Sequence, residues 1–341
     1  MNNQGVWCPA QGIAERTLEQ TNSNAYGAKS VEVNVPSTTA NLGPGFDVFG
    51  LAHDAFVDSV KVEIVKGRNV EVNVLGVDAD SVSRDVDKNT AGIVARSFLK
   101  KLPSDCGLRL QIMKRIPVGK GLGSSGASAA ACIFGLNRLL DLQLSNNEMI
   151  QHAASGEVAS AGCAHADNVA ASVLGGFTII QSYEPFHVIG IAPPENLRLA
   201  VAVPDLQIGE KKTAYARAML PRLVSMEKMV RNVGHASSMI VGILTGDLDL
   251  LGRSMMDAVV EPERAKLIPG YSKVKQKALA AGAKGVAISG AGPTMIALVD
   301  EKSAAVLQVA EAMKDAFQDE GTLCNILISK PSMGARIVEE S

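Results

Sequence analysis

The chain has 341 residues, 47% of them hydrophobic and 20% charged, which is typical of a soluble globular protein of about two domains. The formal net charge of −2 gives no reason to expect nucleic acid or an anionic membrane surface as a partner, and no apolar run reaches the ~18 residues of a membrane span. The five cysteines form no C-x-x-C pair, which indicates reduced thiols in a cytoplasmic protein rather than a disulfide framework or a zinc site.

The first 29 residues are rich in Asn and Gln and show no apolar period. They lack a basic segment followed by an apolar one, so we expect a flexible extension and no signal peptide. Regular patterning begins at Val31–Val35, where apolar and polar residues alternate as in a strand.

A Gly-Pro-Gly turn follows this strand and is flanked by Asn41 and Asp47. Their side chains either converge on one pocket or satisfy the turn itself, as Asn and Asp commonly do. Beyond the turn, residues 56–65 and 70–75 alternate as two further strands, and we predict a hairpin between them.

A glycine-rich stretch at residues 117–127, the glycine loop, lies between an alternating strand at 108–113 and an Ala-rich helix at 127–140. Its glycines allow backbone N–H groups to approach a ligand closely. The helix that follows adds the positive end of its dipole, which suits an anion such as phosphate. Ser124 and Ser125 stand at the helix start, where a hydroxyl caps the helix or reaches a metal ion carried by phosphates.

Other interpretations of the glycine loop stay open on its residues alone. It is no Walker loop, because no Gly-Lys-Ser/Thr follows four variable residues. Gly121-x-Gly123-x-x-Gly126, with Asp141 20 residues after Gly121, matches the dinucleotide-binding pattern. That match is weak, because little chain separates the helix from Asp141 for a second strand. A tight turn before a packed helix is an equally good interpretation.

Residues 146–161 predict a second helix, started by a capping box of Ser145 and Glu148. Glu157 stands on this helix among small and apolar residues. A buried lone carboxylate is costly unless it meets a cation, so Glu157 is either a metal ligand or a residue on a solvated face.

Further candidate polar residues are spread along the second half of the chain. His165 and Asn168 stand at a predicted helix start, where capping is the simpler interpretation. Thr213 and Arg217 are four residues apart, so they share a face if this segment is helical. Arg264 lies in a predicted loop, and a lone arginine is most often a surface charge.

Two predicted strands, 177–182 and 199–203, flank a Pro-Pro loop, and we place a domain boundary between residues 195 and 196. Near the chain end, Gly290 lies in a glycine turn at 285–294, before an apolar strand. Neither feature indicates a function by itself.

Together, these motifs resemble those of the GHMP kinases, the superfamily of galactokinase, homoserine kinase, mevalonate kinase and phosphomevalonate kinase. Pro117-x-Gly119-x-Gly121-Leu-Gly-Ser-Ser-x-Ala127 is similar to their phosphate loop, and residues 285–294 are similar to their third motif. Asn-Leu-Gly-Pro-Gly-Phe-Asp, which ends at Asp47, is similar in particular to the homoserine kinase family. The resemblance covers about residues 31–330, and three motifs in the right order rarely occur by chance.

The resemblance implies an α+β, two-domain GHMP kinase fold with the ATP site in the interdomain cleft. The N-terminal domain, with ATP and the phosphate loop, would span residues 30–195, and the C-terminal domain 196–341, after a flexible extension of residues 1–29. The family's left-handed βαβ crossover is a further implication, against the usual right-handed preference.

The resemblance also implies a cytoplasmic enzyme that uses ATP and Mg²⁺ to phosphorylate L-homoserine to O-phospho-L-homoserine, on the way to threonine. No nucleic-acid or membrane partner is expected, and self-association into a homodimer is left open. The residues that the resemblance assigns to ATP are Pro117, Val118, Gly119, Lys120, Gly121, Leu122, Gly123, Ser124, Ser125, Gly126 and Ala127. Those assigned to the substrate are Asn41, Asp47, Asn168, Thr213, Arg217, Arg264 and Gly290; those assigned to the metal are Ser125 and Glu157; those assigned to catalysis are Asn168, His165 and Glu157.

Three alternatives remain at this point. The nearest is another small-molecule GHMP kinase, such as a mevalonate or shikimate kinase. A nucleotide-binding regulator without catalysis is disfavoured by the intact pair of Ser125 and Glu157, and a dinucleotide oxidoreductase depends on the weak glycine match. Other branches of the superfamily have Asp where this chain has Asn168, and an amide takes no proton, so we expect positional catalysis, with His165 as the rival general base.

Overall fold

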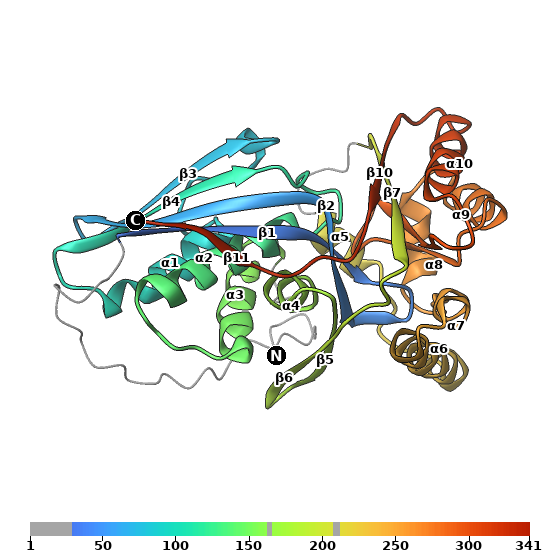
Figure 1. The fold of residues 1–341 in the computed structure, drawn as a ribbon, viewed down its shortest axis with the longest axis horizontal. Coiled ribbons are helices and arrows are strands. Elements are labelled where there is room, and N and C mark those ends of the chain that lie inside the picture. The colour runs from blue at the N-terminus through green and yellow to red at the C-terminus, as the bar shows by residue number, and fades with distance from the viewer. Residues whose placement is uncertain (1–28, 162–165, 207–211) are drawn as a thin grey trace.

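The computed structural model describes residues 29–161, 166–206 and 212–341, which form two β-sheets and their helices (Figure 1). His165 and most of the predicted N-terminal extension lie outside the described residues. Within them, no helix is both long and apolar enough to cross a membrane.

The first sheet has seven strands, with the order β11-β1-β2-β4-β3, and with β5 paired to β2 and β6 paired to β5. These strands are β1 Ser30–Asn41, β2 Gly45–Lys66, β3 Val70–Gly76, β4 Cys106–Lys114, β5 Phe177–Tyr183, β6 Phe186–Ile191 and β11 Arg336–Glu340. The helices α1 Thr90–Phe98, α2 Ser124–Leu139, α3 Asn146–Ala161 and α4 Asp167–Leu174 pack together beside this sheet (Figure 1).

The second sheet has four strands in the order β10-β7-β9-β8. They are β7 Leu197–Pro204, β8 Gly285–Ile288, β9 Met295–Asp300 and β10 Cys324–Ser329. The helices of this half are α5 Lys212–Ala218, α6 Met226–Thr245, α7 Leu248–Arg253, α8 Glu261–Arg264, α9 Tyr271–Ala280 and α10 Val306–Gln318.

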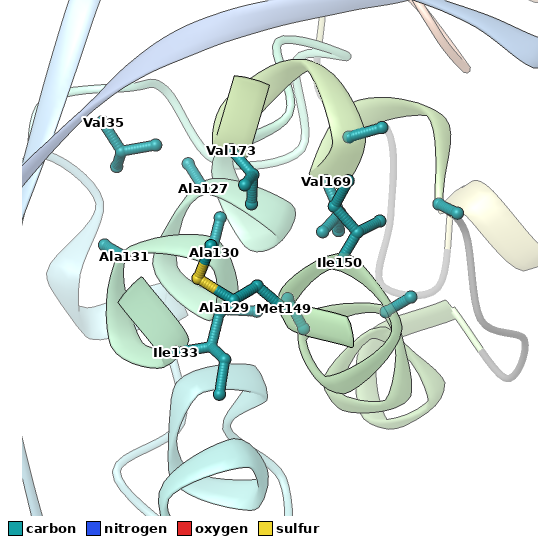
Figure 2. Packing of buried hydrophobic residues seen from close by; sticks show 14 of the residues in the cluster. Val35, Ala127, Ala129, Ala130, Ala131, Ile133, Met149, Ile150, Val169 and Val173 are labelled. Carbon is teal, nitrogen blue, oxygen red and sulfur yellow. The ribbon is translucent and has the colours of Figure 1, made fainter. Parts of the chain in front are cut away.

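The Ala-rich run is a buried helix, as predicted, and it begins at Ser124. Its small side chains let it approach a strand and two helices at once, so that residues from β1, α3 and α4 surround it (Figure 2). The predicted capping box at the start of α3 is also confirmed, because the Glu148 carboxylate accepts the Ser145 N–H at 2.9 Å and the Ser145 hydroxyl accepts the Glu148 N–H at 3.3 Å. Burial of this helix layer against the sheet fixes where α2 begins.

The predicted hairpin between residues 56–65 and 70–75 is wrong. Strand β4 lies between β2 and β3, pairing antiparallel with the first and parallel with the second. Alternation identifies a strand but not its partner, and a parallel pair needs a crossover connection, which α1 supplies here.

Three other elements differ from the expectations. Strand β6 was not predicted, and residues 261–264 of the predicted loop form the short helix α8. Strand β11 pairs with β1, so residues 336–340 return to the first sheet, although the sequence analysis assigned them to the C-terminal domain. The chain therefore passes between the sheets twice, between β6 and β7 and between β10 and β11.

His53 is buried near the point where the chain leaves β10 and returns to the first sheet. Its Nδ1 is 3.3 Å from the Ser37 hydroxyl and 3.2 Å from the Ser329 hydroxyl. Ser37 donates to the His53 carbonyl and Ser329 to Asp54, so both hydroxyls accept from Nδ1, which therefore carries the proton. Nε2 has no hydrogen-bond partner among the described residues, and burial lowers the pKa of His53 to about 4.

We expect this histidine to make the protein less stable in mild acid. The folded pKa lies below the ordinary histidine value of 6.5, so the unfolded state binds the proton more readily, and stability is lost as the pH falls from about 6.5 toward 4. The shift corresponds to about 3 kcal/mol of unfolding free energy. Urea unfolding of wild type and of His53→Asn at several pH values in this range measures the effect. The unfolding free energy of the variant should fall less steeply with decreasing pH than that of wild type. Equal slopes would show that His53 does not cause the loss of stability.

Candidate active site

The glycine loop connects β4 to α2, as predicted. At Gly121 the backbone φ is +83°, and an added Cβ would lie 2.3 Å from the Ser289 carbonyl oxygen. At Gly123 φ is +72°, and a Cβ would lie 1.9 Å from the Thr38 hydroxyl. Both positions therefore require glycine, for conformation and for close approach. Gly123 is also the N-cap of α2, and no side chain caps this helix, so its first N–H groups face the loop without a capping hydroxyl.

The three motifs contact one another. The Ser289 hydroxyl donates to the Gly121 carbonyl at 2.7 Å, which joins the third motif to the glycine loop. The Gly290 N–H donates to the Ala40 carbonyl at 3.1 Å, and the Asn41 amide donates to the Gly290 carbonyl at 3.0 Å. Residues far apart in sequence thus meet where the two sheets adjoin.

A buried ion pair lies beneath the glycine loop. The side chains of Lys114 and Asp58 are 2% and 0% exposed and bond directly to each other. Lys114 Nζ also donates to the Ser124 carbonyl at 2.8 Å, while Asp58 accepts the Arg115 and Ile116 N–H groups at 2.6 and 2.8 Å. Burial lowers the pKa of Lys114, and the Asp58 charge opposes that shift. The pair therefore holds both ends of the loop.

Ser125 and Glu157 form an oxygen pair at the start of α2. The Ser125 hydroxyl donates to the Glu157 carboxylate at 2.7 Å, and Glu157 is 7% exposed. A hydroxyl and a carboxylate are hard oxygen ligands, which suit Mg²⁺. No group of three or more His, Cys, Asp or Glu residues in the described chain could hold a metal. Two ligands from the protein fit an ion whose other ligands are phosphate oxygens and water.

Asn168 lies against the glycine loop from the α4 side. Its amide oxygen accepts the Thr38 hydroxyl at 2.8 Å and would lie 3.1 Å from a Cβ at Gly123. The adjacent Asp167 accepts the Asn168 backbone N–H at 2.8 Å. The structure thus brings Asn168 to the place where the glycine loop enters α2.

A cluster of charges lies next to the first motif. Asp47 and Arg217 form a two-pronged ion pair, and their side chains are 19% and 17% exposed. Phe46 contacts both arginines, with the guanidinium carbons of Arg217 and Arg264 at 5.2 and 5.1 Å from its ring centre. The Tyr183 hydroxyl donates to the Asp47 carbonyl at 2.8 Å.

Arg264 is 5% exposed and holds its place by donating to the Gly290 carbonyl at 2.7 Å. Its Nε has no hydrogen-bond partner in the part of the chain that the structure describes. Burial lowers its pKa, and the nearby Asp47 and Asp167 charges oppose the shift. A buried guanidinium with an unsatisfied N–H is suited to an anionic ligand.

Two further sequence predictions can be placed. Thr213 lies one turn before Arg217 on α5, so the predicted shared helix face is confirmed. Lys120 of the glycine loop donates to the Pro204 carbonyl at 3.3 Å, which ties the loop to the end of β7. Phe46, Tyr183 and the Lys114–Asp58 pair were not predicted from the sequence. For the pair there was one signal: Lys114 occupies a position where the alternation of the strand calls for an apolar residue.

A separate cleft of about 780 Å³ opens where the chain passes between the sheets. Gly175, Pro193, Arg198, Lys330 and Met333 are among the residues that line it, and none of the predicted site residues does. The candidate site therefore depends on the convergence of three motifs and not on cavity size.

Comparison with known proteins decides the family. The model for the GHMP kinases N terminal domain matches residues 89–176, and that for the GHMP kinases C terminal matches residues 239–319. The homoserine kinase of Methanococcus vannielii is 40% identical over 312 residues, covering 91% of this chain and 99% of that protein. The chain belongs to the GHMP kinase family, among the homoserine kinases.

Other relatives of this GHMP kinase agree. The homoserine kinase of Sulfolobus acidocaldarius is 44% identical over 267 residues, covering 78% of this chain and 86% of that protein. The crystal structure of homoserine kinase from Cytophaga hutchinsonii superposes with a TM-score of 0.84 at 34% identity, covering 92% of this chain and 98% of that one. The predicted α+β GHMP kinase fold is confirmed.

The Lys114–Asp58 pair gives a test of what supports the glycine loop in this GHMP kinase. Asp58→Asn should lower the unfolding free energy by about 3–5 kcal/mol, because it leaves a buried ammonium without its counter-charge. Denaturant unfolding measures this loss. Glu71→Gln, which removes one partner of the solvated surface pair with Arg109, is the matched control and should cost far less. Equal costs for the two variants would contradict the interpretation.

Proposed function

We propose that this chain transfers the γ-phosphoryl group of ATP to the hydroxyl of L-homoserine, giving ADP and O-phospho-L-homoserine. One observation supports this choice most: Asp47, Arg217 and Arg264 place a negative and two positive groups together beside the motifs. Such a set is complementary to a free amino acid, which carries an ammonium and a carboxylate close together. The relatives named homoserine kinase support the same substrate.

The glycine loop would bind the triphosphate of ATP. The glycines let its N–H groups approach phosphate oxygens, and the uncapped N-terminus of α2 adds the positive end of a helix dipole. Contacts of Gly121 with Ser289 place this loop against the second sheet, which supports an ATP site between two domains. We propose domains near 30–195 and 196–341, with β11 returning to the first.

Ser125 and Glu157 would hold Mg²⁺. When bound, the ion neutralises negative charge on the phosphates and on the transferring group. The contribution of this chain is to fix the two oxygens: Ser125 is held in the first turn of α2, and Glu157 on α3 accepts its hydroxyl. The charge of Lys114 lies close enough to interact with that of Glu157.

The substrate would lie between the charge cluster and the glycine loop. Asp47 would accept its ammonium, Arg217 and Arg264 would bind its carboxylate, and Asn41, Thr213 and Gly290 would line the same end. Mevalonate and shikimate have a carboxylate but no ammonium, so they would leave the half-buried Asp47 without a cation.

Asn168 would orient the acceptor hydroxyl beside the phosphates. Its amide cannot take a proton, so the proposal is that this kinase accelerates transfer by positioning and by charge neutralisation. Thr38 fixes the amide from the other side, which keeps its orientation constant.

The metal assignment predicts that Glu157→Gln lowers kcat by at least about a hundredfold, because it removes a ligand of the ion that neutralises developing charge. The thermal midpoint should stay within a few degrees of wild type. Steady-state ADP release and thermal melts measure the two effects. Glu148→Ala on the same helix is the control: it removes the capping side chain at the start of α3, so it should lose stability and keep kcat. Normal turnover in Glu157→Gln would refute the assignment.

The substrate assignment predicts that Asp47→Asn costs about 2–5 kcal/mol in kcat/KM for homoserine, as for one partner of a buried charge pair. ATP affinity should be unchanged. The control uses 4-hydroxybutanoate, which lacks the ammonium: on this poor substrate the variant should equal or exceed wild type, because it has no carboxylate at position 47 to leave without a cation. Unchanged homoserine kinetics would show that Asp47 serves only the turn.

The positional account of catalysis predicts a flat dependence of kcat on pH between about 6 and 8. Asn168→Leu should nonetheless lower kcat strongly. If His165 were the base, the rate would instead fall with a histidine-like pKa and collapse in His165→Leu. The pH profile of the two variants and of wild type distinguishes the two accounts.

A further inference from the structure

The carboxylates that are buried in the part of the chain that the structure describes are Asp58, Glu157, Asp167 and Glu261. The first three lie at the glycine loop or next to Asn168. Glu261 lies elsewhere: it is 6% exposed and is the first residue of α8, the helix that carries Arg264. A buried carboxylate is costly unless other groups satisfy it, so the partners of Glu261 indicate what it does.

One oxygen of Glu261 closes the free edge of the second sheet, where β8 is the last strand. Successive N–H groups of a strand point to opposite edges, and the Ser289 N–H points toward the β9 side, where it bonds to the Thr294 carbonyl at 2.9 Å. The Ile288 N–H therefore faces the free edge, and it donates to Glu261 Oε2 at 3.2 Å. Because Ile288 is buried, its N–H would lose a hydrogen bond without this carboxylate.

The other oxygen of Glu261 binds helix α9. Oε1 accepts the Tyr271 hydroxyl, and it accepts the Lys275 ammonium at 2.8 Å. Burial, and then the charge of Glu261, raise the pKa of Tyr271 above its usual value, so the hydroxyl stays protonated and donates. Glu261 thus joins α8, β8 and α9 in the second half of the molecule (Figure 1), and Lys275 balances its charge.

Arg264 lies one turn after Glu261, on the same face of α8. It donates to the Gly290 carbonyl at 2.7 Å, two residues beyond the N–H that Glu261 binds. A helix of four residues is too short to be stable by itself, so the position of α8 depends on bonds of this kind. Two bonds, one from each end of the helix, therefore hold α8 on residues 288–290. Loss of the first would let the helix turn and would redirect the guanidinium at its other end.

We propose that Glu261 is a positioning residue that directs the Arg264 guanidinium toward the carboxylate of the substrate. The inference rests on the proposed function, in which Arg264 binds that carboxylate. Arg217 is oriented by its ion pair with Asp47, whereas Arg264 forms no ion pair within the described chain and depends on the Gly290 carbonyl. The unsatisfied Nε–H of Arg264 serves a ligand only while the orientation of the guanidinium is kept.

Steady-state ADP release with two substrates tests the proposal. One is homoserine, and the other is 3-aminopropan-1-ol, which keeps the ammonium and the hydroxyl but has hydrogen in place of the carboxylate. Glu261→Ala should raise KM for homoserine at least about tenfold and leave kcat within about threefold of wild type, because the carboxylate takes no part in the transfer. With 3-aminopropan-1-ol, kcat/KM should stay within about twofold of wild type, since there is no carboxylate to bind. KM for ATP should be unchanged.

Further variants separate positioning from support of the fold. Glu261→Gln keeps an oxygen for the Ile288 N–H, so it should return KM for homoserine to within about threefold of wild type. In a chain that already carries Arg264→Ala, adding Glu261→Ala should change homoserine kinetics less than about twofold, because the residue that it positions is gone. If the alanine variant does not fold, Glu261→Asp takes its place. It keeps the charge beside Lys275, is one methylene too short to reach Ile288, and should give the same pattern.

The matched control is Glu263→Ala, which removes a carboxylate from the same helix whose partner is Lys266 at the surface. It should leave the kinetics with both substrates unchanged. The proposal is overturned if Glu261→Ala leaves KM for homoserine unchanged while Arg264→Ala raises it. Equal losses with both substrates would also overturn it, because Glu261 would then only support the fold. If Arg264→Ala itself leaves homoserine kinetics unchanged, the proposed carboxylate site fails, and this inference fails with it.

Discussion

The buried pair of Lys114 and Asp58 is the constraint on which the nucleotide side of the molecule depends. Two charges taken out of water cost several kcal/mol each unless other groups satisfy their remaining hydrogen bonds. Here those groups lie in and just before the glycine loop: the N–H groups of Arg115 and Ile116, which precede the loop, bond to the aspartate, and the Ser124 carbonyl near its end accepts from the lysine. Any shift of the loop would leave one of these buried charges without some of its hydrogen bonds. The loop is thereby fixed in a conformation that glycine alone could not enforce.

The two ends of the site have opposite electrostatic requirements, and Gly290 joins them. In the proposed site, the nucleotide end has to neutralise a polyanion, and a helix N-terminus and backbone N–H groups are suited to this. The proposed acceptor end has to receive a zwitterion, to which one carboxylate and two guanidinium groups are complementary. The Gly290 carbonyl accepts from Asn41 and from Arg264, while its N–H bonds to Ala40 beside the first motif. One residue thus fixes the distance between the charge cluster and the phosphate side.

Features encoded within a few residues could be predicted from the sequence, whereas those that depend on pairing across the chain could not. The glycine loop, α2 and the α3 capping box could be predicted because glycine spacing, alanine content and a Ser/Glu pair act within a few residues. Alternation predicted that β3 is a strand but not that β4 is its neighbour. The pattern of a strand shows which of its faces is buried and not which strand lies beside it. The Lys114–Asp58 pair joins residues 56 apart and the Asp47–Arg217 pair residues 170 apart. Asp47 and Arg217 could be found as candidate site residues, but nothing in the sequence indicated that they pair, and nothing in it indicated that Lys114 and Asp58 are buried together.

The Asp47–Arg217 pair has two roles that follow from one contact. Each charge is less than a fifth exposed, so each would be costly without a partner, and together they neutralise each other. A ligand can separate them only by supplying a cation for the carboxylate and an anion for the guanidinium, at the spacing that the pair itself has. An amino acid meets both conditions, whereas a simple carboxylate binds Arg217 and leaves Asp47 unpaired. On the proposed assignment, selectivity for a zwitterion would therefore come from the cost of breaking an internal ion pair as much as from the contacts that the substrate makes.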